Sequence, residues 1–212
     1  MSKIKKNTKE NKKKLSLIVA AICFIIFIGV AVLVATNNIS WLDNSVYSLV
    51  SKMICKPLTS FFKAITMLCQ TEFILIILAL FIIFGKNKKI SSFIVVNAGL
   101  CVLLNQIIKR IFVRTRPVGI ALISQGGYSF PSGHSMMAVA FYGLLIYIIN
   151  KSKLSKTKKV IVTTVLSLLI VLIGLSRIYL GVHFASDVIG GFALSLAYLI
   201  VFINFIYIKK EN

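Results

Sequence analysis

Long apolar stretches constrain this 212-residue chain more than any other feature of its sequence. A helix that crosses a membrane needs about 20 apolar residues, because the hydrocarbon core is about 30 Å thick and a helix rises about 1.5 Å per residue. Six stretches meet this need: residues 15–35, about 60–84, about 90–108, 131–149, about 160–175 and about 186–208. Hydrophobic residues make up 58% of the chain, well above the share in soluble domains. The sequence therefore predicts an all-α fold, a bundle of six transmembrane helices.

The first apolar stretch is too long for the core of a cleaved signal peptide, which has about 7–15 apolar residues. We therefore interpret residues 15–35 as an anchor that stays in the protein. This divides the chain into a basic cytoplasmic tail, residues 1–14, and a membrane-embedded domain, residues 15–212.

The lysines indicate how the predicted helices are oriented. Residues 1–14, 85–89, 150–159 and 209–210 carry most of the lysines, and the six-span arrangement places all four segments on one side. Because cytoplasmic loops carry an excess of Lys and Arg, both termini are predicted to be cytoplasmic. The net charge of +20 is then mostly a topology signal and a contact with anionic lipid. The basic residues follow no pattern typical of nucleic-acid binding, so we expect no such partner.

The segment between the first two spans, residues 37–59, contains apolar residues at helical spacing. This pattern predicts a short amphipathic helix at the membrane interface. Those residues are Val46, Leu49, Val50, Met53 and Ile54.

The four cysteines follow no spacing typical of a disulfide framework or a metal site. Cys23 and Cys101 fall inside apolar runs, where a free thiol behaves as a small hydrophobic residue. Cys55 and Cys69 fall in a segment predicted to lie outside and could pair, although four free thiols is the simpler interpretation.

Three polar clusters interrupt the apolar sequence and contain both histidines of the chain. They are residues 109–117 (KRIFVRTRP), 131–134 (PSGH) and 176–187 (SRIYLGVHFASD). Such groups are costly near a membrane and tend to mark function. In the predicted topology all three clusters lie on the extracytoplasmic side, where a helical bundle could bring them into one site.

The last cluster places His183 and Asp187 four residues apart, so that they would share a face of a helix. Asp187 could then accept a hydrogen bond from the His183 ring and leave the other ring nitrogen free to attack. The alternative is an aspartate that only caps a helix. Arg177 is suited to bidentate phosphate binding, or else is a cation that reaches the interface.

The other two clusters supply groups that suit an anion. Pro131 fits the first turn of a helix, whose N-terminus would direct backbone N–H groups at an anion. Ser132 can donate, Gly133 permits close approach, and His134 lies one turn in.

In the first cluster, Lys109 and Arg116 are seven residues apart, about two helical turns, so we expect them to project the same way. Arg110 and Arg114 we interpret as a solvated charge run. Glu72, at the outer end of the second span, receives no catalytic assignment.

Taken together, eleven residues of the clusters resemble the three sequence blocks of the type 2 phosphatidic acid phosphatase superfamily. The blocks are Lys109-x6-Arg116-Pro117, Pro131-Ser132-Gly133-His134 and Ser176-Arg177-x5-His183-x3-Asp187. That superfamily includes membrane lipid phosphatases and soluble vanadium haloperoxidases. The six predicted spans favour the membrane branch.

The resemblance implies a lipid phosphatase with a phosphohistidine intermediate. It implies that His183 is the nucleophile, that Asp187 orients it, and that His134 is the general acid and base. It further implies five phosphate-binding residues: Lys109, Arg116, Ser132, Gly133 and Arg177. It implies no metal or other cofactor, because side chains supply the positive charge.

Two other site chemistries fit parts of this pattern. Two histidines and one carboxylate could hold a metal ion, but Lys109, Arg116 and Arg177 nearby would repel a divalent cation. A channel or a headgroup-binding protein would use the cations but gives no reason for the His183–Asp187 pair. For the substrate, undecaprenyl diphosphate is favoured among bacterial lipids. Phosphatidylglycerophosphate, phosphatidate and diacylglycerol pyrophosphate stay open, since the blocks contact the phosphate and not the tail.

Overall fold

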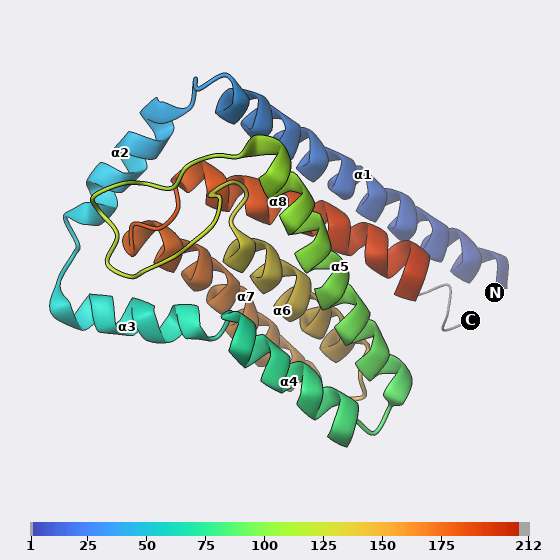
Figure 1. The fold of residues 1–212 in the computed structure, drawn as a ribbon. Coiled ribbons are helices and arrows are strands. Elements are labelled where there is room, and N and C mark those ends of the chain that lie inside the picture. The colour runs from blue at the N-terminus through green and yellow to red at the C-terminus, as the bar shows by residue number, and fades with distance from the viewer. Residues whose placement is uncertain (1, 208–212) are drawn as a thin grey trace.

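The computed structural model describes residues 2–207, with side chains for residues 10–204. All regular structure in this part of the chain is helical (Figure 1). The helices are α1 (Ser2–Ala35), α2 (Ser40–Ser51), α3 (Lys56–Met67), α4 (Thr71–Phe84), α5 (Lys88–Phe112), α6 (Gly133–Lys151), α7 (Lys156–Tyr179) and α8 (Ala185–Val201), followed by a π-helical turn, η1 (Phe202–Tyr207). The all-α prediction is confirmed.

Five helices are long and apolar enough to cross a membrane: α1, α5, α6, α7 and α8, the last continuing to Asn204. The pair α3 and α4 passes the same test as one span that is bent by 41°. The structure therefore has five candidate spans, or six when this pair is counted once. The basic segment at the N-terminus continues α1 as helix from Ser2 onward.

The second predicted span was wrong in its shape, because the chain breaks between α3 and α4 at residues 68–70. Polar contacts with the bundle hold the break. Tyr142 donates to the Leu68 carbonyl oxygen at 2.7 Å, and the Cys69 thiol donates to that of His134 at 3.5 Å. Short-range hydrogen bonds end α3, since the Leu68 amide donates to Ile65. Gln70, Thr71 and Glu72 make the sequence polar at this point, although the sequence prediction carried the span through them.

The predicted amphipathic helix is present as α2 (Figure 1). Trp41 and Leu49 of this helix are exposed, whereas Val46 and Val50 are partly buried against the bundle. The predicted residues Met53 and Ile54 follow the end of the helix. Its one acidic residue, Asp43, is buried against the bundle. The helix therefore has a polar attachment to the rest of the protein.

The helix α6 is the centre of the bundle and packs against α5, α7 and α8 (Figure 1). Outside this group, α1 packs along α8 and α3 against α7. Close packing depends on glycine where α6 crosses α8, because a Cβ at Gly143 would lie 2.6 Å from the Leu199 side chain. At one end of the bundle, Asn204 donates to Ser16 at 3.0 Å and joins the last described turn to α1.

The loop between α5 and α6, residues 113–132, lies at the opposite end, close to α2 and to the ends of α7 and α8 (Figure 1). A backbone hydrogen bond holds it there, since Leu122 of the loop donates to Leu180 at 2.9 Å. Within the loop, Ser129 donates to Arg114 at 2.8 Å. Gly181 allows the contact, since its φ is +68° and a Cβ there would meet the Ile120 carbonyl oxygen at 2.3 Å. The loop and the helix ends form the site described next.

Candidate active site

His183 and Asp187 are in contact where the chain enters α8. Nδ1 of His183 lies 3.3 Å from Oδ2 of Asp187, and both side chains are buried. The helix begins only at Ala185, so His183 precedes it rather than sharing its face. Asp187 also caps the helix, because Oδ2 accepts the Phe184 amide at 2.9 Å. The capping and orienting interpretations of Asp187 therefore describe the same oxygen.

Arg116 fixes the other side of the His183 ring. Its Nη1 lies 2.9 Å from Nε2 of His183 and 2.7 Å from the Val182 carbonyl oxygen. A guanidinium only donates hydrogen bonds, so Nε2 is the accepting nitrogen with a lone pair. Nδ1 then carries the proton and donates toward Asp187. This is the tautomer that a nucleophilic Nε2 requires.

Burial keeps the His183 ring neutral. It lowers the pKa of His183 from its ordinary value to about 4, while the hydrogen bond and charge of Asp187 act in the opposite direction. Arg116 and Arg177 lower the pKa further. The lone pair on Nε2 is therefore available at neutral pH.

Ser129 is a member of the site that the sequence did not reveal. Its hydroxyl donates a short hydrogen bond to Oδ2 of Asp187 and lies 3.3 Å from Nδ1 of His183. The residue is fully buried. The only signal in the sequence is its place two residues before the second polar cluster.

The N-terminus of α6 carries the second cluster. Ser132 is its N-cap and accepts the Ser135 amide at 3.4 Å, so its side chain caps the helix instead of pointing at a ligand. The helix starts at Gly133, two residues later than expected. Tight packing positions this turn: a Cβ at Gly191 of α8 would lie 3.0 Å from the Ser132 carbonyl oxygen.

His134 follows directly in the same turn. Its Nε2 is buried and has no hydrogen-bond partner among the described side chains. Its ring lines the same cavity as His183. An uncompensated ring nitrogen at this place is available to exchange a proton with a bound substrate.

Lys109 and Arg116 meet at the loop, but not as two turns of one helix. Lys109 lies in the last turn of α5, and the helix ends at Phe112, so Arg116 reaches the site from the loop. Lys109 donates to the carbonyl oxygen of Tyr128, and Arg116 donates to the same oxygen at 3.2 Å. Arg116 also donates to Gly126 at 2.9 Å. Both cations are thus held by loop carbonyl groups.

Arg177 is fully buried one layer behind these groups. Nη1 donates to Thr66 of α3 at 2.6 Å, and Nη2 donates to Gln125 of the loop at 2.7 Å. Its Nε is buried without a partner. Arg177 therefore connects the broken span with the loop over the site.

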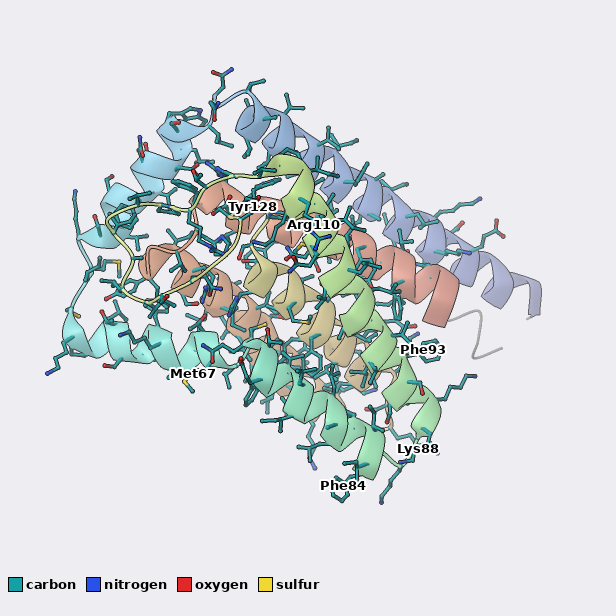
Figure 2. All side chains as sticks on the ribbon, in the orientation of Figure 1. Met67, Phe84, Lys88, Phe93, Arg110 and Tyr128 are labelled. Carbon is teal, nitrogen blue, oxygen red and sulfur yellow. The ribbon has the colours of Figure 1, made fainter. Side chains whose placement is uncertain are left out.

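A cavity of about 740 Å³ opens beside these residues. Its polar end is formed by Lys109, Arg116, Gly133, His134 and His183. Its apolar part lies between α4 and α5 and is lined by Ile74, Leu75, Leu78, Val95, Ala98, Gly99 and Val102. Figure 2 shows Arg110, near the end of α5, and Tyr128, in the loop, both of which also line it. Ser132, Arg177 and Asp187 lie behind the wall.

Arg114 was assigned wrongly as part of a solvated charge run. Its Nη2 lies 2.7 Å from Asp43 of α2, its Nη1 lies 2.8 Å from Asp187, and the side chain is only 17% exposed. Arg110 is exposed and faces the cavity, as a partly solvated cation would. Glu72 is exposed at the start of α4.

The site combines a neutral imidazole, a second buried imidazole and several cations. Within the described residues no group of three His, Cys, Asp or Glu side chains is arranged to hold a metal ion. All four cysteines are free thiols. Cations around an imidazole with a free lone pair suit a phosphoryl group, whose transfer depends mainly on positioning and on charge stabilisation.

Comparison with known proteins also indicates phosphoryl chemistry. Residues 90–211 match the model of the PAP2 superfamily. Phosphatidylglycerophosphatase B of Bacillus subtilis (strain 168) is 35% identical over 179 residues, which cover 82% of this chain and 87% of that protein. An undecaprenyl-diphosphatase of Sulfolobus acidocaldarius is 26% identical over 140 residues, 63% of this chain and 61% of that protein.

Two solved structures share the fold. The crystal structure of a transmembrane PAP2-type phosphatidylglycerolphosphate phosphatase from Bacillus subtilis superposes with a TM-score of 0.80 at 29% identity, covering 91% of this chain and 97% of that one. LpxE of Aquifex aeolicus superposes with a TM-score of 0.60 at 25% identity, covering 76% and 94%.

Proposed function

Because the chain belongs to the PAP2 superfamily and is a membrane lipid phosphatase, we propose that it removes the terminal phosphate of phosphatidylglycerophosphate through a phosphohistidine on His183. One observation carries the proposal: Nε2 of His183 accepts a hydrogen bond at the polar end of a cavity whose other part is apolar. A phosphate enters the polar end, and acyl chains occupy the apolar part between α4 and α5.

The first half of the reaction forms the intermediate. Nε2 of His183 attacks phosphorus, and the bond between phosphorus and the lipid oxygen breaks. His134 protonates the departing oxygen, which leaves as the lipid alcohol. Asp187 stabilises the charge that develops on the His183 ring by holding the Nδ1 proton.

The second half releases phosphate. His134, now neutral, takes a proton from a water molecule that attacks phosphorus. The phosphorus–nitrogen bond breaks, its electron pair returns to Nε2, and inorganic phosphate leaves. The guanidinium of Arg116, already next to Nε2, exchanges its carbonyl partners for phosphoryl oxygens. Lys109 and Gly133, which line the cavity, complete the phosphate site. Arg177 and Ser132 support it from behind the wall, where Arg177 holds the loop and Ser132 caps α6.

Undecaprenyl diphosphate, favoured from the sequence, is the second candidate substrate. The similarity to an undecaprenyl-diphosphatase supports it, as do the phosphate-binding residues, which do not distinguish one lipid tail from another. The greater identity and coverage of phosphatidylglycerophosphatase B support the first candidate.

Released phosphate decides between them. The purified protein is assayed with phosphatidylglycerophosphate, undecaprenyl diphosphate, phosphatidate and diacylglycerol pyrophosphate, each labelled with 32P in the terminal phosphate. We expect the highest kcat/KM with phosphatidylglycerophosphate and an acid-labile labelled protein after rapid quenching. An unlabelled protein, or a His183→Ala protein with normal turnover, would contradict the phosphohistidine.

We further propose that the site faces the extracytoplasmic side of the cell membrane, with residues 1–14 as the cytoplasmic tail of a membrane domain over residues 15–212. The lysine distribution supports this orientation. In a Cys55→Ser background, an impermeant maleimide should label Ser124→Cys in intact cells but not Lys153→Cys. Both positions are exposed. The reverse labelling pattern would place the site on the cytoplasmic side.

A further inference from the structure

A chain of ion pairs runs from α2 to the carboxylate beside His183. Arg114 lies between two acidic residues, with Nη2 at 2.7 Å from Oδ2 of Asp43 and Nη1 at 2.8 Å from Oδ1 of Asp187. The Asp43 side chain is 2% exposed and that of Asp187 is fully buried. Ion pairs removed from water are screened little, and a guanidinium that bridges two carboxylates fixes the geometry of both.

The same pair also holds the residues on either side of Asp187. Asp43 accepts the Ser186 amide and the Ser186 hydroxyl, each at 2.9 Å. Arg114 donates to the Ser186 hydroxyl at 2.7 Å, and its guanidinium lies 4.2 Å from the centre of the Phe184 ring. The first turn of α8 is therefore attached to α2 and to the loop by groups that do not contact the cavity.

The two oxygens of Asp187 have separate partners. Oδ1 accepts from Arg114, while Oδ2 faces Nδ1 of His183, Ser129 and the Phe184 amide. The carboxylate torsion of an aspartate is broad, so each held oxygen restricts it further. Arg114 on Oδ1 acts together with Ser129 and the Phe184 amide on Oδ2 to keep Oδ2 directed at the imidazole.

From this arrangement we infer that Asp43 and Arg114 are positioning residues for the phosphatase reaction: together they fix the rotation of Asp187 and thereby the orientation of His183. The inference rests on the proposed nucleophile. Neither residue contacts the substrate. Asp43 also neutralises the charge of Arg114. Without Asp43, the positive charge of Arg114 would weaken the electrostatic attraction between Asp187 and the His183 ring.

Other titratable groups lie around His183 as well. They are Asp187 from α8, Arg116 from the loop and Arg177 from α7, with His134 from α6 and Lys109 from α5 lining the same cavity. Of these groups only Asp187 contacts Arg114, and none of them is itself substituted in the Asp43 and Arg114 variants. A change in the titration of His183 in those variants therefore reports the pair itself.

The test compares four variants in the purified full-length protein: Arg114→Gln, Arg114→Lys, Asp43→Asn and the double variant Arg114→Gln/Asp43→Asn. Glu72→Gln is the matched control, a carboxylate changed to an amide at an exposed position. The readouts are kcat and KM for phosphatidylglycerophosphate, and the acid limb of kcat/KM against pH. Monodisperse elution and a thermal transition near that of wild type establish folding.

We expect Arg114→Gln to lower kcat about tenfold or more, with KM within about twofold. Arg114→Lys should retain more activity than Arg114→Gln, because lysine keeps the positive charge although it lacks the two guanidinium nitrogens that bind the two carboxylates. The double variant should be more active than Arg114→Gln alone, since the second change removes an unpaired buried carboxylate. Glu72→Gln should match wild type.

The acid limb should move in opposite directions in the two single variants. Removing the positive charge of Arg114 favours protonated His183 and moves the limb to higher pH, whereas Asp43→Asn removes a negative charge and moves it to lower pH. The double variant should return close to the wild-type limb. Arg114→Lys keeps the charge, so a limb that moves to lower pH in this variant reports an Asp187 turned away from His183. A residue that only holds the fold would lower activity and leave the limb of Arg114→Lys in place.

Two results would overturn the inference: single variants with wild-type kcat, or losses of kcat that multiply in the double variant while the acid limb does not move. If Arg114→Gln does not fold, Asp43→Asn and the double variant decide by the same criteria. A His183→Ala protein with normal turnover would instead refute His183 as the nucleophile. An inactive His183→Ala protein, together with Arg114 and Asp43 variants of wild-type activity, would refute the positioning role alone.

Discussion

Nη1 of Arg116 lies 2.9 Å from Nε2 of His183, and this contact determines which ring nitrogen can react. The guanidinium can only donate, so Nε2 holds a lone pair and Nδ1 holds the proton that faces Asp187. The proposed nucleophile, His183, is thus in the tautomer that an attack by Nε2 requires before substrate arrives. Arg116, the cation beside Nε2, is also the residue proposed to bind the phosphoryl oxygens.

The carboxylate of Asp187 should be needed for turnover more than for binding. Asp187→Asn keeps the shape of the side chain but offers an amide that can also donate to Nδ1, which favours the wrong tautomer of His183. We expect kcat to fall by up to about 10⁴-fold, as for the corresponding change in a serine–histidine–aspartate triad, with a small change in KM. Steady-state release of phosphate measures both. A variant that raises KM and keeps kcat would assign Asp187 to binding instead.

The pH dependence should show a low acid limb. Burial holds the pKa of His183 at about 4, below its ordinary value, so the ring is neutral above that pH and loses its lone pair as the pH falls through it. We expect kcat/KM to decrease below about pH 4, together with the yield of phosphoenzyme. The second ionisation of a phosphate monoester, near pH 6, is measured separately on the free substrate. An acid limb at the ordinary pKa of histidine would contradict a buried nucleophile.

The role of His134 can be separated from that of His183 by the leaving group. His134→Gln should lower kcat for the lipid by about 10²–10⁴-fold, because an alkoxide leaves poorly without a proton. The loss in phosphoenzyme formation should be far smaller with p-nitrophenyl phosphate, whose leaving group needs no proton. His183→Gln serves as the control and should abolish both reactions. Equal losses for the two substrates in His134→Gln would argue against an acid at this position.

The apolar part of the cavity should matter only for substrates with long chains. Gly99 of α5 lines it, and a Cβ there meets no atom within 4 Å, so Gly99→Phe fills open space without disturbing packing. We expect a higher KM for long-chain phosphatidylglycerophosphate and unchanged kinetics for glycerol phosphate.

Gly29→Phe is the matched control, because Gly29 of α1 also has nothing within 4 Å but lies away from the cavity. A Gly99→Phe protein that hydrolyses both substrates as wild type does would show that the acyl chains lie elsewhere.

Several features could be predicted because they depend on local sequence alone. Apolar length specifies the spans α1, α5, α6, α7 and α8, and amphipathic spacing specifies α2. The family of the chain was also readable from the three polar blocks. In each case the information lies within one window of sequence or in fixed spacings, so no tertiary contact is needed to find it.

Other features depend on which segments meet in space. The break between α3 and α4 is held by Tyr142 and by the carbonyl oxygen of His134, both distant in sequence. The buried pairing of Arg114 follows from Asp43, 71 residues away. A count could have drawn attention to Asp43, since the chain has only five acidic residues beside 25 basic ones. Nothing in the sequence pairs it with Arg114.

The sequence by itself determined the helices, the membrane character and the identity of the residues that resemble a phosphate site. Only the tertiary structure decided what each polar atom bonds to. It directs Arg116 to Nε2 of His183, gives Oδ1 and Oδ2 of Asp187 different partners, and keeps Arg177 behind the cavity wall. The reason is physical: a membrane span is specified by the solvent around it, whereas a hydrogen bond depends on positions to within a few tenths of an ångström, which only the packed bundle fixes.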